Sequence, residues 1–380
     1  MKNDLKFLSI LILTLALAFT GCDDSSGGGS KLTFDTADTP GDLVSIKAGS
    51  ETVNMIYANN QESINFPFFL LMPFRDVLNP IPVLMTSTLT EKFFMGQTEV
   101  TNAVFAQVLQ WAYDQSPSRF SDTVEDNNGI DSQVAKHEGQ VLINFSDEPS
   151  MPSMIAFDTT TKKFSVETGH ENCPVVCMSL YGAIMFCNWL TEMRDGNTEN
   201  LVYTGMDEGD IWDIFSTLVD SAKTGYRLPS NYEWYFAATY IGTAEPTEGD
   251  LKSEYIARDV NSGPADLTEG YYWTPPSYAS GAVKRSSFEI ETRAVAWFSG
   301  DTGMEEEDKI MPVMQKDANQ LGIYDMSGNV WEKCFDDFDG AVLRGGCFLD
   351  NPEDFPLSFY LQGDNNGFFL EGFRFVRTVP

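Results

Sequence analysis

Only three helix starts can be recognised in this chain of 380 residues, and they lie far apart. Thr101 and Ser179 each stand as an N-cap before apolar residues at helical spacing, and Ser230 with Glu233 forms a capping box after Pro229. The predicted apolar faces comprise Val104, Val108, Trp111 and Ala112; Ile184, Cys187 and Leu190; and Trp234, Phe236 and Ala237. Connections rich in Gly, Asn and Asp separate the helices, and no repeat is visible. The pattern predicts an α+β domain with few helices, short strands and much irregular structure.

The N-terminus carries the features of an export signal. Lys2 and Lys6 precede an apolar run at residues 7–19, which is shorter than the roughly 20 residues of a membrane span and fits a secretory signal. The following Gly21-Cys22 resembles a bacterial lipobox, although Phe19 stands where Leu is usual. The sequence therefore predicts a lipoprotein signal peptide at 1–21, lipidation of Cys22, a flexible tether to residue 41, and one domain at 42–380.

This prediction places the protein in the bacterial cell envelope, held to a membrane by a lipid anchor. The surface of the outer membrane is one location that the sequence leaves open. A cytosolic protein with an apolar N-terminus is the alternative.

The charge and the histidine content exclude several classes of function. Lys and Arg number 24 against 56 Asp and Glu, a formal net charge of −32. Such a chain lacks the basic patch that nucleic-acid phosphates require, so no nucleic-acid partner is expected. With only His137 and His170, a histidine-based triad or a histidine-rich metal site is disfavoured.

The cysteines point to buried thiols. Lipidation of Cys22 leaves an odd number within the chain, so at least one is unpaired or bonds another molecule. Without a CxxC pair, zinc is disfavoured and free cysteines in the core are expected. The five remaining cysteines are Cys173, Cys177, Cys187, Cys334 and Cys347.

Residues 60–90 form an apolar, proline-punctuated insert, with prolines at positions 67, 73, 80 and 82. Each proline restricts its predecessor to extended geometry. The insert is predicted to cover the core irregularly, with an exposed partner-binding flap as the alternative.

Seven segments taken in order resemble one family, that of the formylglycine-generating enzyme or sulfatase-modifying factor. They are residues 43–49 (LVSIKAG), 94–103 (FMGQTEVTNA), 174–190 (PVVCMSLYGAIMFCNWL), 225–238 (GYRLPSNYEWYFAA), 322–332 (GIYDMSGNVWE), 343–346 (LRGG) and 372–377 (GFRFVR). The resemblance extends over nearly the whole chain after the tether. It implies a C-type lectin-like fold in a single domain.

The resemblance also implies a calcium site. The family binds calcium at the positions of Asp325, Gly328, Val330 and Glu332. Two carboxylates and two main-chain carbonyls are ligands of the kind that calcium prefers. Calcium is therefore the expected cofactor, and purely structural roles for these residues are the alternative.

The family's oxidase activity converts a sulfatase cysteine to formylglycine with copper held by two cysteines. These follow the serine of an RGG-Ser-aromatic block at three and eight residues. Here Cys347 occupies the serine position, and Asp350 and Phe355 occupy the cysteine positions. Asp and Phe cannot replace the soft thiolates that select Cu(I). No copper and no catalytic residue are therefore expected, and a formylglycine-generating oxidase is kept as the alternative.

Residues 348–370 contain no Lys, Arg, His, Trp or Met and mix aromatic, acidic and amide side chains with turn-forming residues. Such a mixture is typical of a recognition surface, although each aromatic residue could instead be part of the core. The segment also resembles the variable region of hypervariable ligand-display proteins such as Treponema variable protein. The predicted ligand-binding residues are Phe348, Leu349, Asp350, Asn351, Phe355, Phe359, Tyr360, Asp364, Asn365, Phe368 and Phe369.

The sequence thus favours a binding or display module for an extracellular protein or glycan. A structural envelope lipoprotein is a further alternative.

Overall fold

In the computed structural model the chain divides into residues Met1–Thr33 and Phe34–Pro380. All residues that the structure describes belong to the second unit. They are 43–46, 51–58, 82–89, 93–115, 122–125, 133–145, 153–204, 218–220, 222–242, 255–257, 271–273, 279–282, 288–299, 309–336, 340–350, 361–362 and 370–378. The signal peptide, Cys22 and the tether lie outside these ranges, so the predicted boundaries at 21 and 41 stay predictions.

The three predicted helices are present, each starting at the predicted residue. They are α1 (Asn102–Asp114), α2 (Leu180–Asp195) and α3 (Asn231–Thr239). The Thr101 and Ser179 side chains accept hydrogen bonds from the main-chain N–H groups of Val104 and Gly182. Both bonds of the Ser230 capping box are formed. The sequence did not predict a further helix, α4 (Phe288–Val295).

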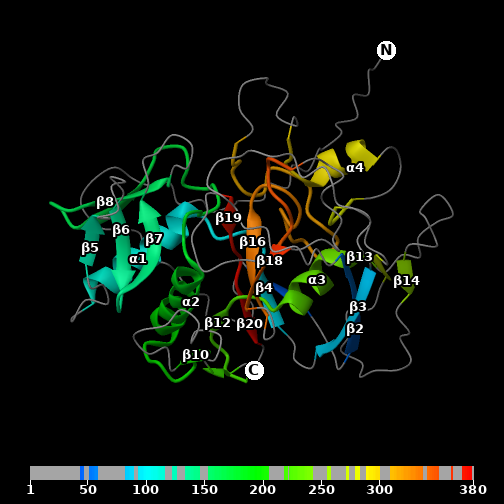
Figure 1. The fold of residues 1–380 in the computed structure, drawn as a ribbon, viewed down its shortest axis with the longest axis horizontal. Helices are drawn as coiled ribbons and strands as arrows, with labels where there is room; N and C mark the ends of the chain where they lie inside the picture. Colours follow the sequence, from blue (N-terminus) through cyan, green and yellow to red (C-terminus); the bar gives the residue numbers. More distant parts are fainter. Residues whose placement is uncertain are drawn as a thin grey trace, which may run out of the picture. The chain divides into compact units, whose positions relative to one another are not determined.

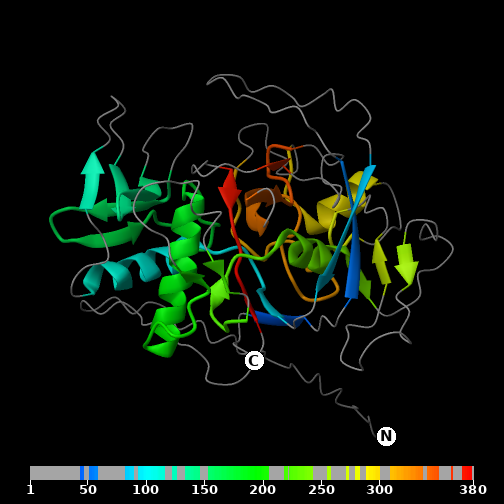
Figure 2. The ribbon, with the colours of Figure 1, turned by 60° about the horizontal axis from the view of Figure 1, so that its bottom comes forward.

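The predicted apolar face is confirmed for α3 and corrected for α1. Trp234, Phe236 and Ala237 of α3 are buried. In α1, Val104 and Trp111 are only half-buried, while Phe105 and Leu109 are fully inside. Helix α2 is buried from Leu180 to Thr191 because it contacts α1, β7 and β12, and Figure 2 shows α1 and α2 crossing each other.

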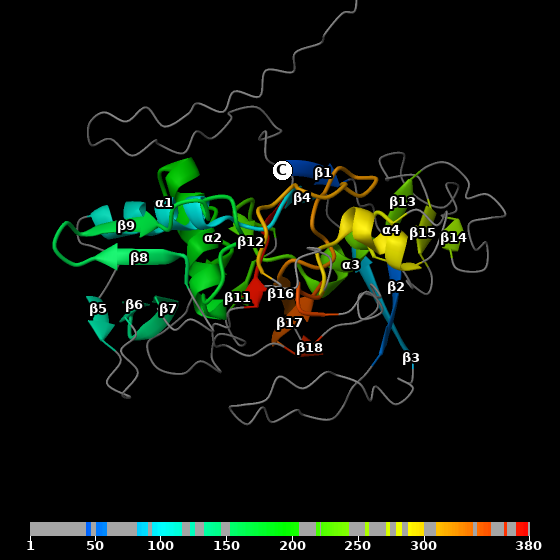
Figure 3. The same ribbon diagram turned by 90° about the horizontal axis from the view of Figure 1, so that it is seen from above.

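Two four-stranded sheets contain parts of six of the seven sequence blocks on which the family resemblance rests, and the block at 174–190 leads into α2. The first is antiparallel, in the order β1 (Leu43–Ile46), β4 (Phe93–Gly96), β20 (Val376–Thr378) and β12 (Tyr226–Arg227). The second has the order β18 (Leu361–Gln362), β17 (Gly340–Arg344), β16 (Trp331–Asp336) and β19 (Glu371–Gly372). Only β16 and β19 are parallel within it. Helix α3 packs against β16 (Figures 1 and 3).

The remaining described strands form small antiparallel sheets. They are β5 (Asp122–Glu125), β6 (Gln133–His137) and β7 (Gln140–Phe145); β8 (Ile155–Asp158) and β9 (Lys163–Val166); β10 (Tyr203–Thr204) and β11 (Leu218–Val219); and β13 (Tyr240–Gly242), β14 (Tyr255–Ala257) and β15 (Tyr271–Trp273). The prediction of an α+β domain with few helices and short strands is confirmed.

The end of the 60–90 insert differs from the prediction. Residues Pro82–Leu89 form β3, which pairs along its whole length with β2 (Glu51–Ala58). Proline is tolerated at the first residue of a strand because its missing N–H is not needed there, so Pro82 does not prevent pairing. The rest of the insert lies outside the described residues.

One hydrophobic core of the described residues lies between α3 and the two four-stranded sheets. Trp234, Phe93, Met95, Ile323 and Val376 are among its fully buried members. The five cysteines from Cys173 onward are all buried and form no disulfide bond, which confirms the expectation of core thiols. Within the part of the chain that the structure describes, no helix has the length and apolar character to cross a membrane.

Candidate functional site

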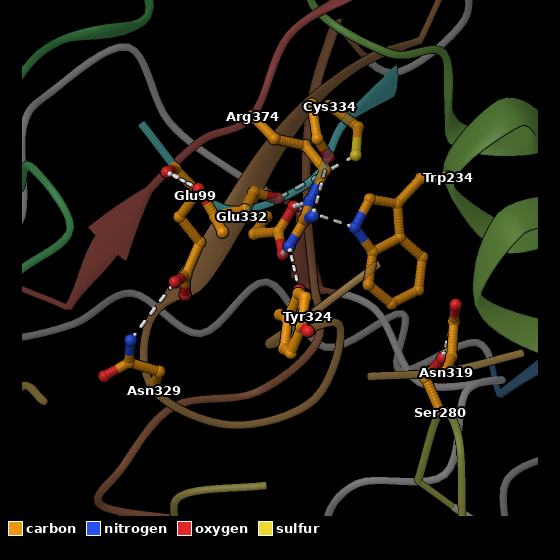
Figure 4. Close-up of polar contacts among 11 residues, drawn as sticks. Glu99, Trp234, Ser280, Asn319, Tyr324, Asn329, Glu332, Cys334 and Arg374 are labelled. Carbon is orange, nitrogen blue, oxygen red and sulfur yellow. Dashed lines mark hydrogen bonds and ion pairs between the residues drawn. The ribbon is translucent and has the colours of Figure 1, made fainter. Parts of the chain in front are cut away.

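A buried ion pair joins the two four-stranded sheets. Arg374, just before β20, donates from Nε to Glu332 Oε2 and from Nη2 to Glu332 Oε1, each at 2.6 Å. Both residues are completely buried, and Trp234 Nε1 of α3 also donates to Glu332, at 3.0 Å. The guanidinium further donates to the carbonyls of Gly96 and Tyr324 (Figure 4). One arginine thus ties the end of β4, the loop at 324 and strand β16 together.

A second polar contact lies beside this pair. Glu99, three residues after β4, accepts a hydrogen bond from Asn329 Nδ2 at 3.1 Å (Figure 4). Asn329 also bonds both the N–H and the carbonyl of Met311, while Asp325 accepts from the N–H of Met314. The 311–314 loop is therefore fixed by the side chains of Asn329 and Asp325.

The second oxygens of Glu99 and Asp325 have no hydrogen-bond partner in the described structure, although both residues are at least 98% buried. Three carboxyl groups, counting Glu332, thus face a single guanidinium. Burial first, and then the charges of Asp325 and Glu332, raise the pKa of Glu99 well above its usual value. Burial likewise raises the pKa of Asp325 to about 6.

Asp325 is expected to make the fold less stable as the pH rises from about 4 to 6. A carboxyl whose pKa is raised by folding stabilises the fold below its unfolded pKa, and this contribution is lost as the pH rises through the folded value, here about 6. The raised pKa corresponds to about 3 kcal/mol at neutral pH. Asp325→Asn should remove this dependence and be the more stable protein at pH 7. Urea denaturation at pH 4, 5, 6 and 7 measures the difference.

Asp158 is a control because its pKa is shifted in the opposite direction to that of Asp325. Hydrogen bonds from Thr161 and Thr160 lower the pKa of this exposed carboxylate. Its contribution is present above the unfolded pKa and is lost as the pH falls through the folded pKa, so Asp158→Asn should lower stability to the same extent at pH 5, 6 and 7 and lose its effect only at more acidic pH. A pH profile for Asp325→Asn parallel to that of the wild type would contradict the assignment of Asp325.

Left-handed backbone geometry is concentrated around these side chains. Asp325 has φ of 55° and Asn329 of 59°, values that residues other than glycine seldom adopt. Gly328 has φ of 78°, and a Cβ placed on it would lie 2.1 Å from the carbonyl oxygen of Trp297. Only glycine fits there, because the turn and the Trp297 backbone are in direct contact.

The predicted calcium ligands are close in sequence but have different roles in the described structure. Both oxygens of Glu332 are occupied by Arg374, whereas Asp325 retains one oxygen that is free to bind. No group of three or more Asp, Glu, His or Cys residues among the described ones is placed to hold a metal. Glu332 therefore fits the site poorly and Asp325 fits it better. Calcium binding stays a prediction.

Calcium binding can be tested by thermal melting. Calcium in excess should raise Tm above the value in chelator, because a ligand that binds only the folded state stabilises it. Asp325→Ala should remove this rise in Tm. Asp317 is an exposed acid eight residues earlier in the chain, and Asp317→Ala should leave the rise unchanged. The same Tm for the wild type in calcium and in chelator would contradict the prediction.

The residues at the family's copper positions do not fit copper. Asp350 caps a turn, since its Oδ2 accepts from the N–H of Cys347 at 2.7 Å. Cys347 is buried, and this burial, followed by the charge of Asp350, raises the pKa of its thiol well above the usual value. Burial also raises the thiol pKa of Cys173 to about 11 and of Cys177 to about 12. At neutral pH these thiols are protonated, so a metal would have to displace their protons to bind them.

Only three of the predicted ligand-binding residues lie within the described ranges. Phe348 is 7% exposed and belongs to the core, and Leu349 is half-buried against an apolar cluster. Asp350 is half-buried in its turn. Burial and the turn thus engage the side chains of Phe348 and Asp350, and a ligand-binding role for these three residues stays a prediction. The other eight, Asn351, Phe355, Phe359, Tyr360, Asp364, Asn365, Phe368 and Phe369, lie outside the described residues.

The fold and this site define a class of protein: an α+β domain whose sheets are joined by a buried Arg–Glu pair beside a glycine-containing turn. The chain belongs to the family of the sulfatase-modifying factor enzyme 1-like domain, whose model matches residues 31–379. This confirms the family resemblance. The chaperone protein LppX of Paenibacillus barcinonensis is 26% identical over 231 residues, which are 55% of this chain and 71% of that protein.

Three solved structures are similar to the chain. Treponema denticola variable protein 1 has 20% identity and a TM-score of 0.47, with 89% of this chain and 95% of that chain covered. CarF has 19% identity and a TM-score of 0.49 (89% and 98% covered). PvdO from Pseudomonas aeruginosa has 14% identity and a TM-score of 0.41 (87% and 92% covered).

Proposed function

We propose that this chain is a non-catalytic binding module of the sulfatase-modifying-factor family, held at the bacterial cell envelope by a lipid on Cys22. Its ligand is an extracellular protein or glycan, bound by the segment that follows Phe348. Strands β17 and β19 of the second four-stranded sheet precede and follow this segment in the chain, and β18 lies within it.

The observation that carries the proposal is the turn at Cys347–Asp350. The side chain of Asp350 occupies the turn, and the Cys347 thiol is buried and protonated. Copper oxidation by the family's mechanism needs two thiolates at the Asp350 and Phe355 positions. With aspartate and phenylalanine there, the same part of the fold is better suited to contact a ligand than to oxidise one.

Binding is tested with the lipid-free protein from residue 23 onward on arrays of glycans and of secreted proteins. A ligand retained by the wild type should be lost after Phe359→Ala and Tyr360→Ala, two residues of the predicted surface. Lys163→Ala, in the distant exposed ion pair with Asp114, should keep it. Aldehyde formation on a sulfatase-motif peptide in the presence of copper would instead favour the oxidase alternative.

The anchor is tested separately in cells. An alkyne-tagged fatty acid should label the full chain, and Cys22→Ala should lose the label and leave the membrane fraction. Ser26→Ala, four residues further on, serves as the matched control. Labelling that persists in Cys22→Ala would contradict the anchor without bearing on ligand binding.

A second candidate function is an assembly role in the envelope, which is favoured by the similarity to a protein named as a chaperone. Its test is a refolding assay. The chain should raise the yield of a refolding exported protein in proportion to its concentration, while an unrelated acidic protein should not.

A further inference from the structure

Two arginines and two aromatic rings lie together on the first four-stranded sheet. Arg377 of β20 is directly opposite Phe94 of β4 on one side and Tyr226 of β12 on the other. Its guanidinium carbon lies 5.3 Å from the centroid of the Phe94 ring. The guanidinium carbon of Arg194, near the end of α2, lies 4.9 Å from the centroid of the Tyr226 ring. We call these four residues the arginine stack, in which cation–π attraction holds each guanidinium over a ring.

The acid beside the arginine stack is already engaged by Arg194. Arg194 donates from Nε to Asp195 Oδ1 at 2.5 Å and from Nη2 to Asp195 Oδ2 at 2.8 Å. Asn200 donates to the same Oδ2, also at 2.8 Å. The Nη1 group of Arg194 donates to the carbonyl of Thr224 at 3.1 Å. The charge of Asp195 therefore offsets mainly that of Arg194.

Arg377 is the less compensated of the two guanidinium groups. Its Nε is buried and has no hydrogen-bond partner in the described structure, while the residue as a whole is half-buried. Burial first, and then the charge of Arg194, lower the pKa of Arg377. Burial acts on Arg194 too, but the hydrogen bonds and charge of Asp195 outweigh it and raise the pKa of Arg194. Such a cation stands out in a chain with 24 basic and 56 acidic residues.

We propose that the arginine stack binds a phosphate group and that Arg377 contacts it. A guanidinium presents its N–H groups in a planar fork that matches phosphate oxygens. Arg194 uses only part of its five donors within the protein, so it keeps donors for the same ligand. A phosphate, whose oxygens point in several directions, can bridge two guanidinium groups, whereas a carboxylate matches a single fork.

This site goes beyond the proposed function, in which the segment after Phe348 contacts a protein or glycan. The arginine stack belongs instead to β4, β20, β12 and α2. A phosphate group can come from a soluble molecule or from the headgroup of a phospholipid, and the experiment distinguishes these sources.

Calorimetric titration with inorganic phosphate at constant ionic strength tests the site in the lipid-free protein. The wild type should bind phosphate saturably, and Arg377→Gln should bind about tenfold more weakly or worse, because a charged hydrogen-bonding group is lost. Arg293 also lies over an aromatic ring, 5.1 Å from the centroid of Phe298, so Arg293→Gln is the matched control and should bind like the wild type. Equal affinity in Arg377→Gln, or no saturable binding by the wild type, overturns the proposal. Equal affinity of the wild type for acetate overturns the choice of phosphate.

Phenylglyoxal modification of the wild type keeps the test decisive if Arg377→Gln does not fold. The reagent modifies guanidinium groups, and mass spectrometry follows Arg377 and Arg293 separately. At a phosphate concentration about ten times Kd, modification of Arg377 should slow about tenfold, since only the free site reacts. Arg293 should react at an unchanged rate. The same rate at Arg377 with and without phosphate contradicts the site.

Vesicles of phosphatidylcholine, with and without phosphatidic acid, identify the source of the phosphate. Sedimentation of the wild type with the phosphatidic acid vesicles alone, lost in Arg377→Gln, assigns the site to a lipid headgroup. Binding of inorganic phosphate without sedimentation assigns it to a soluble molecule. Binding of neither overturns the proposal and leaves the result of the glycan and protein arrays unaffected.

Discussion

Arg374→Met is expected to lower the free energy of unfolding by about 4 kcal/mol or more, enough to leave much of the chain unfolded at 37 °C. The substitution removes the guanidinium that holds both oxygens of Glu332, in a region where neither residue touches solvent. It also leaves Glu99 and Asp325 without the positive charge that offsets their burial. Urea denaturation followed by tryptophan fluorescence measures the loss, since Trp234 bonds to Glu332 directly.

An exposed ion pair supplies the matched control. Lys163 and Asp114 lie 3.4 Å apart with more than half of each side chain exposed. Lys163→Met, the same change from cation to methionine, should cost at most about 1 kcal/mol because water screens such pairs. The double variant Arg374→Met with Glu332→Gln should recover part of the loss, since it no longer buries an unpaired charge. If Arg374→Met and Lys163→Met were equally stable, the buried pair would contribute no more to stability than the exposed pair, contrary to the expectation.

Gly328→Ala is expected to be nearly as damaging, with a loss of about 3 kcal/mol or more. Left-handed geometry costs a residue with a Cβ roughly 1–2 kcal/mol, and forcing an atom into a packed contact adds about 1–3 kcal/mol. Here the added carbon would lie 2.1 Å from a main-chain oxygen, which cannot rotate away. The Trp297 segment would have to move, and with it the Ser299 bond to Asp350.

Gly322 separates the cost of backbone strain from the cost of the contact between the added Cβ and the main chain. Its φ of 79° matches the 78° of Gly328, but no atom lies within 4 Å of the position that its Cβ would take. Gly322→Ala should therefore cost only the roughly 1–2 kcal/mol of backbone strain. Thermal melts of both variants give the difference. Equal losses would mean that the contact with Trp297 relaxes freely, contrary to the expectation.

The sequence contained no direct signal for the buried polar cluster. Glu99, Asn329 and Arg374 each lie in a recognised block, yet Asn329 and Glu99 bond across 230 positions and Arg374 reaches Glu332 across 42. Pairing over such separations depends on which strands become neighbours. A charged residue inside an apolar block was the available hint, because a buried charge needs a partner. The identity of that partner was not readable from one sequence.

Local signals, by contrast, were sufficient for the starts of three helices and for the buried thiols. N-caps and capping boxes act within about four residues, so Thr101, Ser179 and Ser230 could be read directly from the sequence. Strand β3 was missed because its pairing with β2 depends on a partner 24 residues or more away.

By itself, the sequence determined the fold class, the family and the replacement of the copper-position cysteines by Asp350 and Phe355, since all three follow from residue identities and local order. Tertiary structure decided the roles of these residues. It placed Asp350 in a turn, buried Phe348, and gave both oxygens of Glu332 to Arg374. A side chain's role depends on whether its polar atoms meet solvent, a ligand or another buried group, and only the packing of distant segments settles that.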